Sequence, residues 1–176
     1  ADFNAEFAAA DYARVVDNQD LKLWEKDSQM VWHLGMDNTA QWFDNNLVRQ
    51  AVNYAVDRDS CLQVGYEGLG KVVYNCATFA PTVMGAVENP LDMYSYDPAK
   101  AKALMEEAGC PGFSTQLIVF RDEAERMATV VQANLADIGI SAEITRIENA
   151  VFPSYIAEHK APMFITSWGC YGDPDL

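Results

Sequence analysis

Basic residues are scarce in this chain. Its 12 Lys and Arg stand against 26 Asp and Glu, so the formal net charge is −14 at pH 7. A surface of this charge repels the phosphates of nucleic acids and of anionic membranes on average. The composition therefore disfavours a nucleic-acid partner, and we interpret the acidity as a contribution to solubility rather than as a dedicated cation site.

Long apolar runs are missing as well. No stretch approaches the roughly 20 apolar residues that a helix needs to cross a bilayer. The first residues, "ADFNAEFAAADYAR", have neither the basic segment nor the apolar core of a signal peptide. The sequence also lacks an initiator Met, and we expect that residues preceding Ala1 were removed by processing or by the choice of the expressed segment.

Metal-binding residue types are few and scattered. The histidines and cysteines are His33, His159, Cys61, Cys76, Cys110 and Cys170. They form no CxxC pair and no zinc-ligand spacing. Calcium-loop spacing is likewise missing from the carboxylates at Asp92, Asp97, Asp173 and Asp175. We therefore predict neither a metal nor another cofactor, while two disulfides in an exported protein and four buried thiols both remain compatible with the cysteines.

What is present is the sequence of one ordinary domain of 176 residues, half of them hydrophobic. A domain of this length buries about 70% of its unfolded surface and needs no disulfide or metal to fold. Its first half predicts a helix with Phe3, Phe7 and Ala10 at helical spacing, then strands at 21–25 and 29–36. An amphipathic helix follows, marked by Val48, Ala51, Val52, Ala55 and Val56, and a short helix begins near Asp57.

The second half alternates strands and helices. Asp97 as N-cap, Pro98 at the first helical position and Gly109 as a stop define a helix. The order is then strand 115–120, helix 122–138, strand 141–147, a short helix near 154–159 and strand 163–168. This series predicts an α/β fold with a mixed, partly parallel sheet flanked by helices. Between the two halves, residues 70–96 predict a long irregular surface loop.

Ligands of such sheets bind outside the carboxyl ends of the parallel strands. Two segments of this sequence follow predicted strands in that position. They are "FRDEAE", which begins at Phe120, and the final "SWGCYGDPDL", which begins at Ser167.

Several motifs in one order carry a resemblance to a known family. They are "FDNNLVRQAVNYAVDRDSCLQVGYEGLG", "YSYDPAKAKALMEEAG", "LADIGISAEI" and "MFITSWGCYGDPD". In this order they resemble the extracytoplasmic solute-binding proteins of peptide-type ABC importers, the dipeptide, oligopeptide and nickel family. The family's "R-A-x-x-x-A-x-D-R" helix is matched, with a small spacing difference, by Arg49, Ala51, Ala55, Asp57 and Arg58.

The resemblance implies one lobe of a two-lobed, periplasmic-binding-protein-like fold. Residues 1–176 correspond to the second lobe alone, as a single α/β lobe that contains the irregular loop 70–96. The implied function is capture of a small solute, peptide-like in the first place, by hinge closure, without catalysis. The implied partners are the ligand, the first lobe of the same protein and ABC permease subunits. The implied location is extracytoplasmic, with a lipid anchor on the full-length protein.

The resemblance also implies a pocket loop that begins at Trp168. Peptide binders of the family carry an Asp shortly after this Trp that pairs with the ligand's α-amino group, because a buried ammonium needs an opposite charge. Here those positions hold Cys170 and Tyr171, and the next carboxylate is Asp173. Asp173 either substitutes for the missing Asp or only shapes the turn. Cys170 either pairs with another cysteine, with Cys76 as a guess, or stays a free thiol.

Arg121 and His33 complete the set of expected ligand-binding residues. Arg121 follows a strand, where the family's loop holds a specificity residue; it either binds a ligand carboxylate or pairs with Glu125 on its own helix. Alternation places Val31, His33 and Gly35 on one face of their strand, and the resemblance turns that face toward the cleft. A lone strand His is, however, more often structural than a ligand contact.

Two other classes of function are compatible with parts of the sequence. A ligand-sensing domain of a transcriptional regulator is the alternative, since some regulators carry a similar domain. An enzyme with Cys170 as nucleophile would need a base, and neither histidine is near it in sequence. The sequence leaves the ligand open among a peptide, a nickel complex, a glutathione-like molecule and a sugar.

Overall fold

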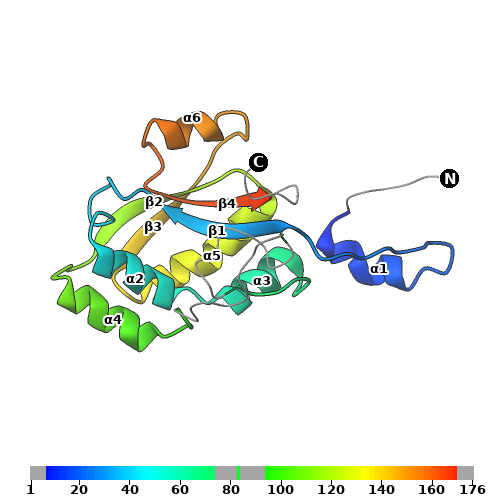
Figure 1. The fold of residues 1–176 in the computed structure, drawn as a ribbon, viewed down its shortest axis with the longest axis horizontal. Coiled ribbons are helices and arrows are strands. Elements are labelled where there is room, and N and C mark those ends of the chain that lie inside the picture. Colours follow the sequence, from blue (N-terminus) through cyan, green and yellow to red (C-terminus); the bar gives the residue numbers. More distant parts are fainter. Residues whose placement is uncertain (1–6, 74–82, 84–93, 170–176) are drawn as a thin grey trace.

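Four strands form a mixed sheet in the computed structural model, which describes residues 7–73, 83 and 94–169. The strands are β1 (Met30–Met36), β2 (Phe113–Val119), β3 (Ile140–Arg146) and β4 (Met163–Gly169), and their order in the sheet is β1-β4-β2-β3 (Figure 1). β2 runs parallel to both β3 and β4, whereas β1 is an antiparallel edge strand beside β4. The predicted α/β class with a mixed, partly parallel sheet is confirmed.

One face of the sheet carries the main core. The helices below the sheet in Figure 1 are α2 (Asn46–Ala55), α3 (Arg58–Tyr66), α4 (Pro98–Glu107) and α5 (Asp122–Ala136). Leu117 and Met163 of the strands pack with Val52 of α2 and Leu135 of α5, and these side chains are fully buried. The predicted apolar stripes therefore turn inward, as helical periodicity requires.

The helix starts follow from capping side chains. The Asn45 side chain accepts a hydrogen bond from the backbone N–H of Leu47 at 2.9 Å, and Asp97 accepts one from that of Lys100 at 2.9 Å. Each such cap stabilises a helix by about 1 kcal/mol. Gly109 follows α4 with φ +64°, the left-handed conformation that glycine adopts at little cost. The boundaries predicted for α4 from Asp97, Pro98 and Gly109 are confirmed.

The opposite face of the sheet is covered in part. The short helix α6 (Phe152–Ala157) lies above it in Figure 1 and forms a second apolar cluster around Ile118 and Phe152. The Phe164 ring belongs to this cluster and lies directly over Gly35, where an added Cβ would meet it at 2.3 Å. This face is therefore packed near the beginning of β4 and less so near its end.

The N-terminal predictions need correction. The structure has a short 3-10 helix, Ala9–Asp11, and α1 (Tyr12–Val16), whereas Phe7 is exposed and not helical. Phe3, also predicted to be helical, lies outside the described residues. The strand predicted at 21–25 is not formed. Its Leu21 is exposed, and a strand without a neighbouring strand is not stable by itself. The described residues of the loop 70–96 include no helix or strand.

None of the described helices combines the length and apolar character of a membrane span.

Candidate functional site

The carboxyl ends of three strands meet at one edge of the sheet. Since β2, β3 and β4 are parallel, their last residues face the same way, and the antiparallel β1 adds its first residues there, with Met30 opposite Gly169. Arg121, just after β2, and Trp168, near the end of β4, thus lie at the same edge. This is the edge at which open α/β sheets bind ligands.

Trp168 is exposed at this edge. It is 60% exposed and pairs with Val31 across the β1–β4 ladder. Directly paired residues of an antiparallel ladder point to the same face, so Trp168 shares a face with Val31, and with Thr166 and His33 by alternation. That face is opposite α5. Trp168 is therefore not part of the main core.

His33 faces the same side of the sheet and lies opposite Thr166. Its neighbours Trp32 and Leu34 pack against the main core, as alternation predicted. The Nδ1 atom of His33 is buried without a well-formed hydrogen bond to any described residue. Burial lowers the pKa of His33, and the Val31 backbone opposes this shift only in part, so the ring is neutral near pH 7. A buried polar atom without a partner costs roughly 1–3 kcal/mol.

Arg121 precedes α5 and is exposed. Its guanidinium carbon lies 5.6 Å from the centre of the Phe120 ring, a cation–π arrangement that holds the charge at the sheet edge. The pair with Glu125, one of the two alternatives for Arg121, is not observed, because Glu125 and Asp122 both bind Arg146 of β3. Within the described part of the chain, Arg121 forms no ion pair.

The rest of the predicted loop, Cys170, Tyr171 and Asp173, lies outside the described residues, as does Cys76. The two described cysteines, Cys61 and Cys110, are free thiols. Burial, aided by the charge of Asp57, raises the pKa of the Cys61 thiol to about 11, so it is unreactive near neutral pH. Across residues 7–73, 83 and 94–169, no three His, Cys, Asp or Glu side chains gather as a metal site would require.

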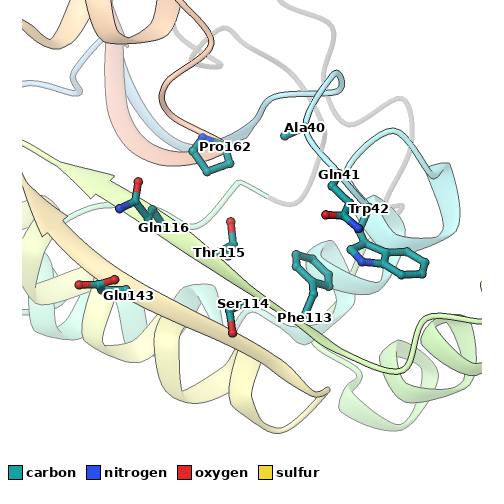
Figure 2. Close-up of a pocket in the computed structure, with 9 residues that line it drawn as sticks. All are labelled: Ala40, Gln41, Trp42, Phe113, Ser114, Thr115, Gln116, Glu143 and Pro162. Atoms are coloured by element: carbon teal, nitrogen blue, oxygen red, sulfur yellow. The ribbon is translucent and has the colours of Figure 1, made fainter.

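A separate hollow of about 350 Å³ lies at the other end of the sheet (Figure 2). Its lining comes from the start of β2, from β3 and from two loops, and comprises Ala40, Gln41, Trp42, Phe113, Ser114, Thr115, Gln116, Glu143 and Pro162. Met163 pairs with Leu117, so Thr115 and Trp168 are separated by seven residues of strand rise, roughly 23 Å. This hollow is therefore distinct from the carboxyl edge.

Sequence reasoning missed three residues of these two regions. The contact of Phe120 with Arg121 was not predicted, although the sequence places this aromatic residue directly before Arg121. Thr166 lies beside His33 only because β1 and β4 pair, and such a contact between distant segments is not signalled by the local sequence. Trp42 stacks on Phe113 with ring centres 6.2 Å apart and has φ +70°, which no local pattern in the sequence signals.

Comparison with known proteins gives a consistent result. The family model of bacterial extracellular solute-binding proteins, family 5, middle region, matches residues 1–175. The dipeptide-binding protein of Escherichia coli (strain K12) is 33% identical over 174 residues, which cover 94% of this chain and 32% of the relative.

Two solved structures share the fold. The periplasmic binding protein DppA from Helicobacter pylori, in complex with the peptide STSA, is 28% identical with a TM-score of 0.86, covering 95% of this chain and 32% of that one. HbpA2 from Haemophilus parasuis is 30% identical with a TM-score of 0.83, covering 99% of this chain and 35% of that one. This chain spans about a third of the length of these proteins, and it belongs to family 5 of the bacterial extracellular solute-binding proteins.

Proposed function

We propose that residues 1–176 are the second lobe of the solute-binding protein of an ABC importer. The lobe supplies one wall of a ligand site, a first lobe supplies the other, and hinge closure presents the loaded receptor to a membrane permease. The observation that supports this proposal is the carboxyl edge of the sheet. The exposed indole of Trp168 and the guanidinium of Arg121, which has no ion pair with a described residue, lie at this edge. The neutral imidazole of His33 lies farther along β1, on the same face as Trp168. Family membership favours this role over a regulator's sensing domain, and the role involves no catalysis.

Each side chain has a distinct part in the proposed site. Trp168 offers a rigid apolar face against which an extended ligand packs. Arg121 offers two parallel N–H donors to a ligand carboxylate. His33, which is neutral, offers a ring nitrogen to a ligand or to the opposite lobe when the site closes. Cys170, Tyr171 and Asp173 would complete the loop after Trp168.

The ligand class that fits best is peptide-like with a free carboxylate. Arg121 suits the carboxylate, and two of the similar proteins named above are described as binding a dipeptide and a peptide. Recognition of the ligand's α-amino group has less support, because Cys170 and Tyr171 stand where peptide binders carry an Asp. A peptide with a modified or missing amino terminus is therefore a preferred candidate alongside simple dipeptides.

The proposed setting is outside the cytoplasmic membrane. The partners would be the first lobe, the permease subunits and a lipid anchor that keeps the receptor near them. The family description as extracellular solute-binding proteins supports this location.

The test is a ligand screen on the full-length protein by thermal shift. A ligand that binds the folded state raises Tm by mass action. Dipeptides, amino-blocked peptides, glutathione, a nickel chelate and sugars form the panel, and we expect a carboxylate-bearing peptide-like compound to raise Tm. No shift from any compound at millimolar concentration would contradict the proposal.

The site assignment is tested with Trp168→Ala on the same protein. We expect about tenfold weaker binding, which corresponds to a loss of about 1.4 kcal/mol, in line with one aromatic contact. Tyr96→Ala is the matched control, because Tyr96 is an exposed aromatic just before α4 that the proposal does not place in the site. Equal affinities for the two variants would remove Trp168 from the site.

A further inference from the structure

Two arginines at the carboxyl edge of the sheet differ in their partners. Arg146 is the last residue of β3 and pairs with Val119 of β2, so it lies at the edge where Arg121 precedes α5. The Nη2 atom of Arg146 lies 2.7 Å from Oδ1 of Asp122, and its Nη1 atom contacts Oε2 of Glu125. Arg121, in contrast, forms no ion pair with a described residue.

The acidic residues at the start of α5 are also close to Arg121. Acidic side chains in a first turn are favoured by the helix dipole, which is a reason for their presence apart from either arginine. The backbone N–H of Glu125 donates to the carbonyl oxygen of Arg121 at 3.0 Å, so the two residues are one helical turn apart. Opposite charges at this spacing attract each other along a helix. A Glu125 side chain without another partner is therefore a natural partner for Arg121.

We propose that Arg146 is a positioning residue: by holding two carboxylates of α5, it keeps the guanidinium of Arg121 free for the carboxylate of a ligand. This inference rests on the proposed role of Arg121 in ligand binding. Arg146 acts through Arg121 and does not itself touch the ligand. Arginine suits this task because its planar fork presents separate terminal nitrogens to two carboxylates, whereas lysine presents a single ammonium.

The charges at this edge explain why such a residue matters. A ligand carboxylate is attracted by Arg121 and repelled by any carboxylate of α5 that lacks a partner. Glu123, the third acidic residue of the first turn, forms no ion pair with a described residue. Loss of Arg146 would release two further carboxylates beside the proposed site, as partners for Arg121 and as repulsive charges for the ligand.

A purely structural role is the alternative for Arg146, since its ion pairs link β3 to α5. The Arg146 side chain is 49% exposed, and exposed ion pairs add little to stability. We therefore expect the loss of Arg146 to change the state of Arg121 more than the stability of the fold.

The first experiment measures the reactivity of Arg121 in the full-length protein without ligand. Phenylglyoxal modifies an arginine more slowly when a carboxylate stabilises the charged guanidinium, and peptide mass spectrometry follows the modification. We expect Arg146→Met to slow the modification of Arg121 about two- to threefold, in line with one exposed ion pair, and Arg146→Lys to slow it less. Arg14→Met is the matched control, because Arg14 is an exposed arginine paired with Asp11 that has no part in the inference.

A rescue separates positioning from a structural role. Addition of Asp122→Asn and Glu125→Gln to Arg146→Met removes the released carboxylates, and we expect the wild-type rate at Arg121 to return. A structural Arg146 would not be rescued in this way, because the triple variant still lacks the link between β3 and α5. In the wild-type background, the same two neutral substitutions should leave the rate unchanged, since Arg146 already holds both groups.

Ligand binding is measured separately by calorimetry, with the dipeptide Ala-Phe and its carboxyl-terminal amide as probes. We expect Arg146→Met to weaken binding of the dipeptide about threefold, the triple variant to restore it, and the amide to bind all variants equally. If neither probe binds the wild type, the proposed function loses support, while the reactivity of Arg121 still decides this inference.

The outcomes that overturn the inference are specific. One is an unchanged rate at Arg121 in Arg146→Met, and another is a slower rate that neutral residues at 122 and 125 do not restore. Weaker dipeptide binding with unchanged reactivity of Arg121 would make Arg146 a direct ligand contact instead. If Arg146→Met does not fold, the two neutral substitutions alone decide: a faster rate at Arg121 would show that Arg146 does not hold these carboxylates away from it.

Discussion

The two faces of the same sheet differ in how completely they are packed. Toward α2 and α5, Leu117 and Met163 are fully buried in the main core. On the opposite face, α6 covers the beginning of β4, while Trp168 at its end is exposed and the Nδ1 atom of His33 is buried without a well-formed hydrogen bond to any described residue. Residues of the same strand, β4, thus contribute to the main core on one face of the sheet and remain exposed on the other. Among the described residues, the second face is therefore the less completely packed of the two near the end of β4.

The largest expected effect is on the packed face. Leu117→Ala removes a fully buried side chain from the main core, and we expect it to lower the free energy of unfolding by about 2–5 kcal/mol. Thr166→Ala, on the other face, should change it by less than about 1 kcal/mol. Urea denaturation of both variants measures the contrast. Similar losses at the two positions would break the distinction between the faces.

A smaller effect is expected where the second face is packed. Gly35→Ala places a Cβ against the Phe164 ring, so we expect a loss of about 1–3 kcal/mol from overpacking. The double variant Gly35→Ala, Phe164→Leu should recover part of this loss by giving the Cβ room. Thermal unfolding of the single and double variants tests this. A Gly35→Ala variant as stable as the wild type would show that α6 does not hold Phe164 in place.

The smallest effect concerns pH and His33. Because burial lowers the pKa of His33, the unfolded chain binds a proton first as the pH falls below about 6.5. As the pH falls from above 6.5 toward the lowered pKa of the folded state, His33 therefore lowers the free energy of unfolding. The slope is at most about 1.4 kcal/mol per pH unit. His33→Gln should be relatively more stable at pH 5.5 than at pH 7.5, measured by urea denaturation. The same stability difference at both values would contradict a buried, neutral His33.

How far the sequence predicted the structure depends on whether a signal was local. The boundaries of α4 rest on Asp97, Pro98 and Gly109, all within its own segment, and they were correct. The alternation of residues along β1 correctly placed His33 on the face opposite Trp32 and Leu34. These features need no knowledge of distant partners.

Predictions that depended on distant partners were wrong or incomplete. Residues 21–25 alternate like a strand but have no neighbouring strand in the described structure. Glu125 was weighed as a partner of Arg121 at helical spacing, yet β3 brings Arg146 to it instead. The pairing of His33 with Thr166 likewise depends on strand order, which one sequence does not reveal.

The most direct test of the central claim is to locate the ligand on the sheet. Isothermal titration calorimetry of the full-length protein with its ligand would compare Arg121→Gln, at the carboxyl edge, with Gln116→Ala, in the hollow of Figure 2. We expect Arg121→Gln to weaken binding about tenfold or more, as loss of a charged hydrogen bond does, and Gln116→Ala to leave it unchanged. Weakened binding in Gln116→Ala alone would place the ligand at the opposite end of the sheet and contradict the account.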